Sequence, residues 1–416
     1  MAAPQPLVII GASYAGAQLA ASARELGFDA PIVMVGDELH APYQRPPLSK
    51  GLLTGKTTAD KLALRGADFY VENGIEMRLG RRATALDAGA RTVTLEDGST
   101  LPYGWLALAT GARCRPLPVP GGELQGVLSL RTLDDALRIA AAADQARRVV
   151  VIGGGFIGLE VASALRQREA EVTVIEGQPR LLARSFLPEM STYIEDAHRA
   201  RGVTVLCGRG VRALHGDDKG HVDRVELDDG SSVPCDLVVL GIGVVPNSEL
   251  AQAAGIACDN GILVDALGRT SAPNVLAIGD VANVALPTMP GGPARARLES
   301  IQAANDGARA AATVLVGREP PAAPVPWFWS DQYELKFQMA GLPQPGDHAV
   351  LRGDMASGRF SVFFLRGERL VAAHSVNRPA EHMLARKLIA AAVQPQPAQL
   401  ADESFDLKSV LSPASP

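Results

Sequence analysis

The residues best placed to do chemistry in this chain are three glycines, Gly153, Gly155 and Gly158. They follow a short apolar run and precede a segment rich in Ala and Leu. In a strand–turn–helix, the first glycine permits the turn, the second lets the backbone approach a pyrophosphate, and the third lets the helix pack on the strand. The next apolar run ends in Glu176, whose carboxylate suits the ribose 2′-hydroxyl of NAD. The segment therefore predicts an NAD site.

Two arginines leave the choice of nicotinamide coenzyme open. Arg180 and Arg184 follow Glu176 closely and could serve the 2′-phosphate of NADPH. Glu176 is the better-placed group because it ends the strand, and its charge would repel a 2′-phosphate. We therefore expect NADH.

A second segment of the same kind lies near the N-terminus. Gly11 and Gly16 occupy the places of the first and third glycines, and Ser13 replaces the middle one. Serine is small and its hydroxyl can donate to a phosphate, so we expect the phosphate-binding turn to form despite the substitution. Asp37 or Glu38 ends the next strand as the ribose acid. Two such sites imply two dinucleotides, and FAD is the one that accepts two electrons and releases them singly.

The elements that must position these turns repeat as well. After each copy, an Asp-Gly pair between alternating runs predicts a hairpin, at Asp97-Gly98 and at Asp229-Gly230. A further strand-like run, Asn274–Asp280, is expected to return to the sheet of the first copy, because the second copy already has its last strand. The first domain would then be discontinuous, with the second inserted into it.

The composition changes beyond Gly317. The Pro-rich stretch Arg318–Pro326 cannot form a helix or a central strand. Strand-like runs and a helix near Glu381–Val393 follow, which predicts a small α+β domain, and we expect the tail after Gln394 to be partly mobile. The predicted domains are residues 1–114 with 245–325 for FAD, 115–244 for NAD, and 326–416 at the C-terminus.

Composition excludes several classes of protein. The 416 residues carry 40 Lys+Arg against 45 Asp+Glu, a net charge of −5, which disfavours a nucleic-acid binder. The four cysteines stand far apart without a CxxC pair or a Cys/His cluster, so we expect small buried hydrophobes, no redox dithiol and no metal site. Neither a signal peptide nor an apolar run long enough to cross a membrane is visible, so a soluble cytoplasmic protein is expected.

Several further motifs carry a family resemblance. They are Tyr43–Lys50 (YQRPPLSK), Ala109–Ala112 (ATGA), Ala277–Asp280 (AIGD), Arg297–Gln302 (RLESIQ) and Trp327–Gln332 (WFWSDQ). With both glycine turns, the chain resembles the FAD- and NADH-dependent ferredoxin reductases of bacterial oxygenase systems, the putidaredoxin reductase and biphenyl-dioxygenase reductase-like family, over nearly its whole length. Two departures are Ser13 and the Ala303-Ala304 pair, which stands where many members have Asn-Ala.

The resemblance implies an α/β fold class. It consists of two Rossmann-like dinucleotide-binding domains, in the glutathione-reductase-like FAD/NAD(P)-binding arrangement, plus the small C-terminal α+β domain. It also implies roles. Asp280 would accept from the ribityl chain of FAD, and Arg45 and Lys50 would be cations beside the flavin ring. Glu160 would face Lys50 as an ion pair near flavin N5, and Trp329 would lie by the isoalloxazine on the ferredoxin-facing side.

The full set of expected site residues follows from the motifs and the resemblance. Lys50, Glu160 and Trp329 are the expected catalytic residues. The expected cofactor contacts are Gly11, Ser13, Ala15, Gly16, Asp37, Arg45, Lys50, Ala109, Thr110, Gly111, Arg131, Gly153, Gly155, Phe156, Ile157, Gly158, Glu160, Glu176, Gly243, Gly279, Asp280, Ser300, Ile301, Gln302 and Trp329.

The implied reaction is hydride transfer from NADH to FAD, followed by two one-electron transfers to a [2Fe–2S] ferredoxin. Such a ferredoxin would supply a P450 monooxygenase or a Rieske dioxygenase. Because these ferredoxins are acidic, we expect a local basic patch, with Arg309, Arg386 and Lys387 as candidates.

The sequence also bears on three other functions. A disulfide reductase or NADH peroxidase needs a cysteine by the flavin, and the Tyr43–Lys50 stretch has none. A direct NADH:quinone or NADH:acceptor reductase stays open. A redox signalling protein resembling apoptosis-inducing factor would need a strongly basic surface, which the net charge does not favour.

Overall fold

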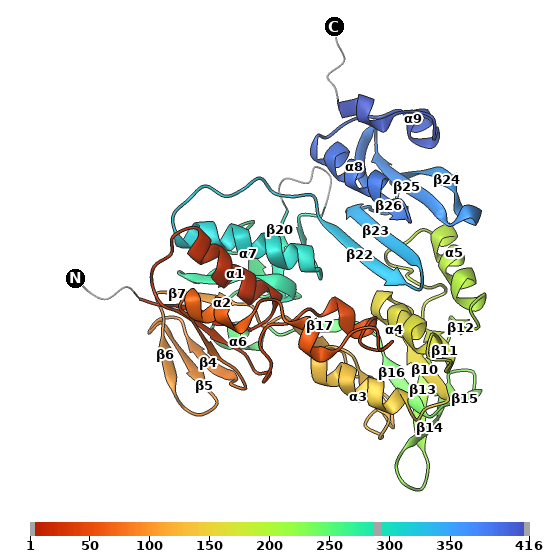
Figure 1. Ribbon diagram of the computed structural model, residues 1–416, viewed down its shortest axis with the longest axis horizontal. Coiled ribbons are helices and arrows are strands. Elements are labelled where there is room, and N and C mark those ends of the chain that lie inside the picture. The colour runs from red at the N-terminus through yellow and green to blue at the C-terminus, as the bar shows by residue number, and fades with distance from the viewer. Residues whose placement is uncertain (1–4, 287–292, 412–416) are drawn as a thin grey trace.

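Three groups of elements, each built around one larger sheet, make up the molecule. The computed structural model describes residues 5–286 and 293–411. In Figure 1 the first group lies on the left, the second at the lower right, and the C-terminal group above the second. The two parallel sheets carry the glycine turns, and the C-terminal sheet is antiparallel.

The first group is a parallel sheet between helices and a smaller antiparallel sheet. Leu7 and Ile9 pack toward helices α1 (Tyr14–Glu25) and α7 (Ile301–Leu315), whereas Val8 packs on the other face. In sheet order its strands are β19 (Val275–Ala277), β7 (Trp105–Leu108), β1 (Leu7–Ile10), β2 (Ile32–Val35) and β3 (Ile75–Arg78). The second face is covered by β4 (Ala83–Asp87), β5 (Thr92–Leu95) and β6 (Thr100–Pro102).

Two expectations for this group are confirmed. The Asp97-Gly98 pair connects β5 to β6, which are antiparallel neighbours. Strand β19 pairs in parallel with β7, so the run Asn274–Asp280 does return to the first sheet.

The second group repeats the plan. Val149 and Val151 of its central strand face helix α4 (Phe156–Arg166), and Val150 faces a small antiparallel sheet. The parallel order is β12 (Thr204–Cys207), β11 (Glu171–Glu176), β10 (Arg148–Ile152), β16 (Leu237–Leu240) and β9 (Val127–Ser129). The antiparallel sheet is β13 (Val211–Gly216), β14 (Val222–Leu227) and β15 (Ser232–Pro234), with the Asp229-Gly230 turn between the last two. Helices α3 (Leu133–Ala143) and α5 (Pro188–Arg199) complete it.

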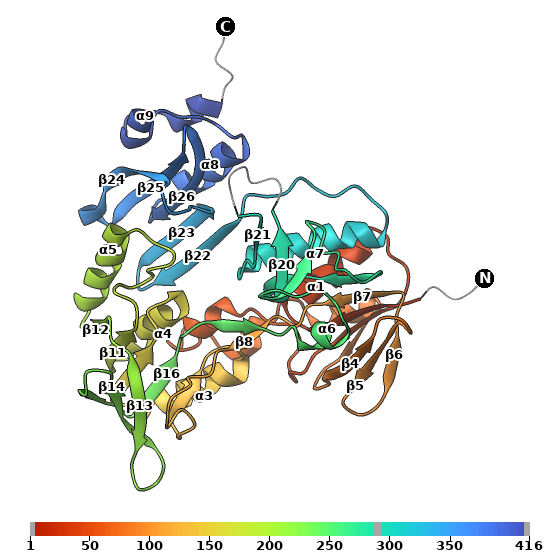
Figure 2. The same cartoon turned by 180° about the vertical axis from the view of Figure 1, so that it is seen from behind.

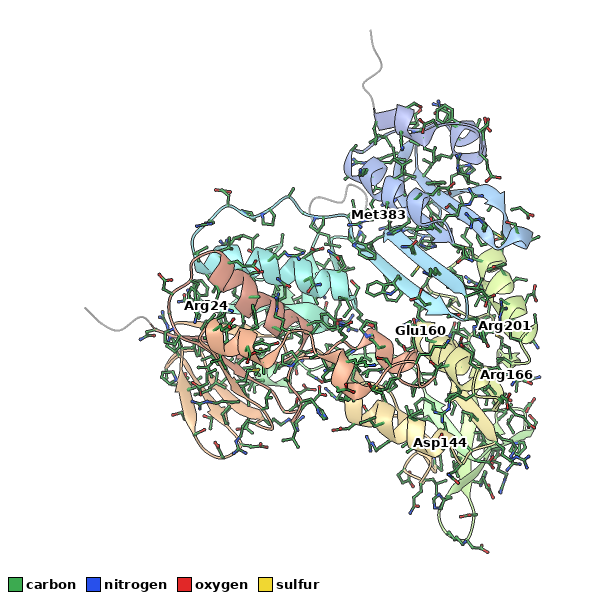
Figure 3. All side chains as sticks on the ribbon, viewed as in Figure 1. Arg24, Asp144, Glu160, Arg166, Arg201 and Met383 are labelled. Carbon is green, nitrogen blue, oxygen red and sulfur yellow. The ribbon has the colours of Figure 1, made fainter. Side chains whose placement is uncertain are left out.

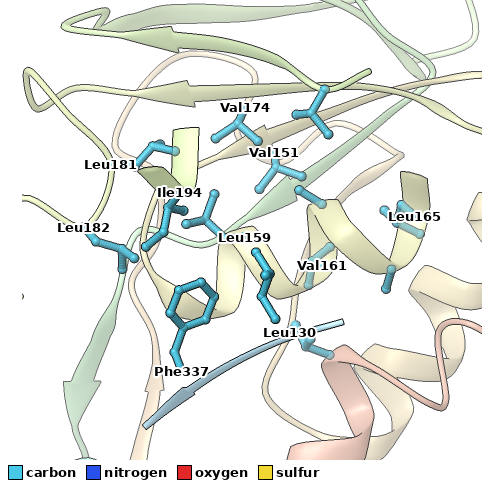
Figure 4. Packing of buried hydrophobic residues seen from close by; sticks show 14 of the residues in the cluster. Leu130, Val151, Leu159, Val161, Leu165, Val174, Leu181, Leu182, Ile194 and Phe337 are labelled. Carbon is cyan, nitrogen blue, oxygen red and sulfur yellow. The ribbon is translucent and has the colours of Figure 1, made fainter. Parts of the chain in front are cut away.

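The C-terminal sheet is antiparallel throughout and shares a core with the second group. Phe337 of β23 points to Leu159 of α4 in Figure 4, and both belong to one buried cluster. In sheet order the strands are β22 (Trp327–Gln332), β23 (Leu335–Gly341), β26 (Arg369–Val376), β25 (Arg359–Arg366) and β24 (His348–Asp354). Helix α8 (Pro379–Ala390) packs on this sheet, and residues 318–326 contain no helix or strand, as predicted.

The expectation of a mobile tail after Gln394 was wrong for the described part. Helix α9 (Pro397–Ala401) and the 3-10 helix Leu407–Leu411 bury Leu400 and Leu407. The guanidinium of Arg352, itself 6% exposed, donates to the carbonyls of Leu400 and Phe405 and so fixes the segment. Because the arginine that holds the tail lies far from it in sequence, the local composition of the tail could not indicate that the tail is ordered.

Short elements connect the groups. Strands β8 (Ala112–Cys114) and β17 (Val244–Pro246) run antiparallel as the two crossings between the parallel sheets (Figure 2). The remaining elements are α2 (Ala67–Glu72), α6 (Glu249–Ala253), β18 (Ile262–Val264), β20 (Ala282–Ala285), β21 (Arg295–Ala296) and the 3-10 helices Pro46–Ser49, Ala59–Leu62, Gly279–Val281 and Met355–Ser357.

Candidate active site

A cavity of about 470 Å³ lies at the carboxyl ends of strands β1, β2, β7 and β19. In open α/β sheets this edge is where ligands bind, because the loops there leave a crevice. Of the expected site residues, those lining the cavity are Gly11, Ser13, Ala15, Asp37, Arg45, Lys50, Ala109, Thr110, Gly111, Arg131, Ile157, Glu160, Gly279, Asp280, Ser300, Ile301 and Trp329.

Two residues of the expected FAD set, Gly16 and Gln302, do not line the cavity. A Cβ on Gly16 would lie 2.1 Å from the carbonyl oxygen of Gly11, so this glycine allows close packing within the turn. The amide of Gln302 donates to Asp306 (2.8 Å) along helix α7. Asn247 lines the cavity without having been predicted, and its Nδ2 donates to the carbonyl of Thr110 (2.8 Å). It stands in no motif, so no sequence signal pointed to it.

The first glycine turn fits the pyrophosphate of FAD. Gly11 has φ +122°, and a Cβ there would lie 2.1 Å from the carbonyl oxygen of Ala109. Ser13 caps helix α1 without a side-chain capping bond, and its Oγ accepts from Arg45 Nε (3.1 Å). A side-chain-free backbone and a helix N-terminus therefore meet in one place, which is the arrangement that binds phosphate, while the guanidinium of Arg45 is engaged by Ser13, Glu38 and the carbonyl of Arg131.

The two candidate ribose acids have different surroundings. Glu38 accepts from Arg45 Nη2 (2.6 Å) and from the hydroxyl of Tyr43, whose pKa burial raises. Asp37 is exposed and lines the cavity. The carboxylate of Glu38 is therefore already hydrogen-bonded within the protein, whereas the carboxylate of Asp37 is available to accept from a ribose hydroxyl.

Asp280 forms an ion pair with Arg131 (2.7 Å) across the cavity. Burial disfavours the charge of Arg131, but the neighbouring carboxylate outweighs it and holds the pKa of Arg131 above its usual range. Arg131 precedes helix α3 and Asp280 follows β19, so the pair joins loops that are far apart in sequence.

The expected pair of Lys50 and Glu160 is present, with Nζ 2.6 Å from Oε2. Glu160 lies where the three groups of elements meet (Figure 3), and its side chain is only 2% exposed. Ser49 Oγ donates to the same oxygen (2.5 Å), and Ser330 Oγ donates to Oε1 (2.6 Å). Three donors from two distant segments therefore satisfy one buried carboxylate, as buried charges require.

Sequence reasoning missed the serines at this carboxylate. Ser330 and Gln332 alternate along strand β22, and both are buried. Polar residues on the buried side of a strand are a signal that a specific hydrogen-bonding partner exists. Trp329 directly precedes Ser330 in this strand, lines the cavity and packs on Trp327 with ring centroids 5.5 Å apart.

The second glycine turn has the same construction as the first. Gly153 has φ +112°, and a Cβ there would lie 2.4 Å from the carbonyl oxygen of Gly241. Gly158 packs against Gly153, and Gly155 caps helix α4. This bare backbone and helix N-terminus fit the pyrophosphate of NAD.

The charged groups near this turn suit a ribose better than a phosphate. Glu176 ends β11, and its carboxylate accepts from the backbone N–H of Gly154 (2.6 Å). Arg180 donates to the carbonyls of Phe186 and Ala183, so its guanidinium is engaged in holding a loop.

Three further residues of the expected NAD set differ in their surroundings. Ile157 is 48% exposed and lines the cavity. Phe156 packs its ring against Phe186 and Phe328, so it belongs to the core beneath the site. Gly243 is exposed with φ +93° after β16 and does not line the cavity.

The cysteines only partly match expectation. Cys235 is buried, but Cys114, Cys207 and Cys258 are half-buried, and Cys114 lines the cavity. All four thiols are free, and burial raises their pKa, to about 11 for Cys207 and about 12 for Cys235. A thiol with a raised pKa is a poor nucleophile. Among the described residues, no group of three His, Cys, Asp or Glu side chains could hold a metal, and no helix is long and apolar enough to span a membrane.

Fold and site together define a two-dinucleotide oxidoreductase with a C-terminal reductase domain. The sequence profile of the pyridine nucleotide-disulphide oxidoreductase family matches residues 5–308, and the profile described as Reductase C-terminal matches residues 327–411. The chain belongs to this family, whose members use FAD and NAD(H).

Named relatives narrow the class. Rhodocoxin reductase of Rhodococcus erythropolis is 45% identical over 406 residues, covering 98% of this chain and 94% of that one. Putidaredoxin reductase of Pseudomonas putida is 40% identical over 418 residues, covering 100% and 98%. The solved complex of putidaredoxin reductase with putidaredoxin matches with a TM-score of 0.94 at 39% identity, covering 98% of each chain. The resemblance drawn from the motifs is therefore confirmed.

Proposed function

We propose that this protein is an NADH:ferredoxin oxidoreductase that uses FAD. Its ferredoxin would be a [2Fe–2S] protein that supplies a P450 monooxygenase or a Rieske dioxygenase. The observation that carries the proposal is the buried pair of Lys50 and Glu160 at the cavity wall. One residue follows the first glycine turn and the other follows the second, so we expect the two cofactors to converge at this pair.

FAD, held at the first glycine turn, would supply a two-electron acceptor for the hydride of NADH that can release its electrons singly. The residues of this chain position the two cofactors for that exchange, which depends on alignment more than on proton transfer. Gly11 and Gly153 give the two pyrophosphates access to the backbone. Lys50 places a positive charge at the cavity wall, and a fixed positive charge stabilises negative charge on a flavin ring.

NADH is the preferred coenzyme in this proposal. The carboxylate of Glu176 stands at the second glycine turn, and Arg180 is committed to backbone carbonyls. A 2′-phosphate would meet a negative charge there without an available partner in Arg180.

The partner is an acidic ferredoxin that docks where helices α7 and α8 approach Trp327 and Trp329. The guanidinium of Arg386 stacks on the ring of Trp327 (4.8 Å), and Arg309 pairs with Asp306 (3.5 Å). Burial raises the pKa of the Asp306 carboxyl, and the positive charges of Arg309 and Arg386 both oppose this rise, so the two cations belong to one patch. Exposed Lys387 follows Arg386 in sequence. The relatives named as ferredoxin reductases and the solved complex with putidaredoxin support this partner.

The test begins with the purified protein. We expect a yellow protein whose bound FAD is bleached anaerobically by one equivalent of NADH, followed by turnover with [2Fe–2S] ferredoxins. Ferredoxin reduction should fall as salt rises, and more steeply for the wild type than for Arg386→Ala. A colourless protein that takes up no FAD would refute the proposal. Turnover with quinone but with none of the ferredoxins would favour the direct NADH:quinone reductase instead.

The domain limits are also part of the proposal: residues 1–114 with 245–325 for FAD, 115–244 for NADH and 326–416 for the C-terminal domain. Their support is the pairing of β19 with the first sheet and of β8 with β17 at the crossings. Limited proteolysis should cut first within residues 318–326, which are largely exposed and contain no helix or strand.

We propose the cytoplasm as the compartment. Four free cysteines, three of them half-buried, suit a reducing compartment, and NADH is formed there. Fractionation of the source cells should recover the protein with cytoplasmic enzymes, and recovery from an oxidising compartment would overturn this assignment.

A further inference from the structure

A row of buried polar side chains leads away from Glu160 into the C-terminal sheet and on to helix α5. Ser330 Oγ lies 2.6 Å from Glu160 Oε1, and Gln332 Nε2 lies 3.2 Å from Ser330 Oγ. His198 Nε2 lies 2.9 Å from Gln332 Oε1. All four residues are at most 3% exposed. Buried polar groups cost free energy unless they are paired, so the hydrogen bonds within this row offset the cost of burying its four side chains.

The direction of every hydrogen bond in the row follows from the carboxylate. Glu160 is charged in its ion pair and can only accept, so the hydroxyl of Ser330 gives it its single proton. The oxygen of Ser330 must then accept from the amide nitrogen of Gln332, which turns the amide oxygen toward His198. His198 must donate from Nε2.

The surroundings of His198 agree with this direction. Burial lowers the pKa of His198, so the ring is neutral and carries one proton. That proton is needed on Nε2, and Nδ1 is buried without a partner among the described residues. Every donor in the row therefore points toward Glu160, and bonds aligned in this way strengthen one another.

We propose that Ser330, Gln332 and His198 are positioning residues that hold the carboxylate of Glu160 for the reaction between NADH and FAD. The inference rests on the proposed function. Without the bond from Ser330, Glu160 Oε1 loses its partner, and more of the negative charge acts on Lys50. Less positive charge then reaches the flavin site, so reduction of FAD becomes less favourable and slower.

The same row fixes the strand that carries Trp329. At the end of that strand, the backbone N–H of Tyr333 donates to Ser163 Oγ of helix α4 (2.8 Å), and the ring of Tyr333 packs on His198 (5.2 Å). Ser330 and Tyr333 thus attach the hairpin of β22 and β23 to the helix that begins at the second glycine turn. The helix at the proposed NADH site and the strand bearing Trp329 are therefore joined by direct hydrogen bonds.

The first experiment compares Ser330→Ala with Ser361→Ala. Ser361 is a matched control because it is equally buried in the same domain and donates to a different glutamate, Glu381 (2.6 Å). We expect Ser330→Ala to slow anaerobic reduction of bound FAD by NADH about tenfold, which is less than the full effect of a hydrogen bond to a charged group. The two-electron potential of FAD should fall by about 30 mV, the equivalent of a tenfold change in equilibrium. Ser361→Ala should leave both unchanged.

The second experiment interrupts the row at its middle. In Gln332→Leu, Ser330 Oγ loses the amide nitrogen that donates to it, and His198 Nε2 loses its acceptor. We expect slower reduction of FAD and a lower potential, in the same direction as in Ser330→Ala but smaller, because Ser330 still donates to Glu160. Wild-type behaviour of this variant would overturn the proposal.

The third measurement needs neither FAD nor turnover. Nitrogen-15 NMR of histidine-labelled, FAD-free protein, assigned with His198→Asn, should find His198 protonated on Nε2. Protonation on Nδ1, or equal effects of Ser330→Ala and Ser361→Ala, would overturn the proposal. If wild-type FAD is not reduced by NADH, the proposed function fails instead, and the NMR result still decides the direction of the row.

Discussion

Replacing Lys50 by methionine should destabilise the protein because it leaves the charge of Glu160 buried without its cation. The carboxylate is 2% exposed and lies 2.6 Å from Lys50 Nζ. With an effective dielectric constant of about 20, such charges attract by about 6 kcal/mol, and desolvation offsets part of this. Removing one partner of a buried pair costs about 3–5 kcal/mol. Because Ser49 and Ser330 still donate and Lys50 is 22% exposed, we expect about 3 kcal/mol.

The assay is guanidinium unfolding of the FAD-free protein, followed by circular dichroism and tryptophan fluorescence. Lys56→Met is the control, since Lys56 is exposed and donates only to the neutral Gln167 (3.2 Å). Its expected cost is below about 0.5 kcal/mol. Adding Glu160→Gln to Lys50→Met should recover about 2 kcal/mol, because the unpaired charge is then gone. A double variant as unstable as Lys50→Met alone would refute the reasoning, because the cost would then come from lost packing of the lysine stem.

Three further changes test other parts of the molecule. Glu176→Gln should lower the ratio of kcat/KM for NADH over NADPH by about tenfold, since one negative charge at the second turn is lost; an unchanged ratio would show that Glu176 does not select the coenzyme. The Gly11→Ala variant should purify with little FAD, because its Cβ would lie 2.1 Å from the carbonyl oxygen of Ala109; the measurement is flavin absorbance per protein. The control is Gly307→Ala on helix α7, which should keep its FAD because a Cβ there has no atom within 4 Å apart from its own helix backbone. Burial lowers the pKa of His374 from 6.5 to about 3. Between these two values the imidazole of His374 is protonated in the unfolded chain and neutral in the folded one. Stability should therefore fall by about 1.4 kcal/mol between pH 7.5 and 5.5 through this residue, and His374→Leu should lose that part of the slope; an identical slope in both proteins would contradict the assignment.

Much of the fold could be predicted because its signals are local. A glycine at positive φ beside a close backbone, as at Gly11 and Gly153, leaves little choice of residue, so the motif is visible without a structure. The Asp-Gly hairpins and the Pro-rich stretch 318–326 are of the same kind. The repeat of one such unit in the chain pointed to two dinucleotides.

Other expectations failed where the deciding contact is remote. Composition alone suggested a mobile tail, but Arg352 of the edge strand β24 donates to backbone carbonyls between Leu400 and Phe405 and so holds the tail. Three cysteines counted as buried are half-buried, because whether a small side chain is covered depends on its neighbours in space.

The sequence by itself determined the two glycine turns, the acids that follow them and the family, because these depend on residues close together in the chain. Only the tertiary structure decided which groups satisfy the carboxylate of Glu160. Ser49 and Ser330 stand 111 and 170 positions away from it, and their hydrogen bonds exist only once three sheets have packed. A buried charge must find its donors wherever the packed chain brings them, and no short stretch of sequence records that outcome.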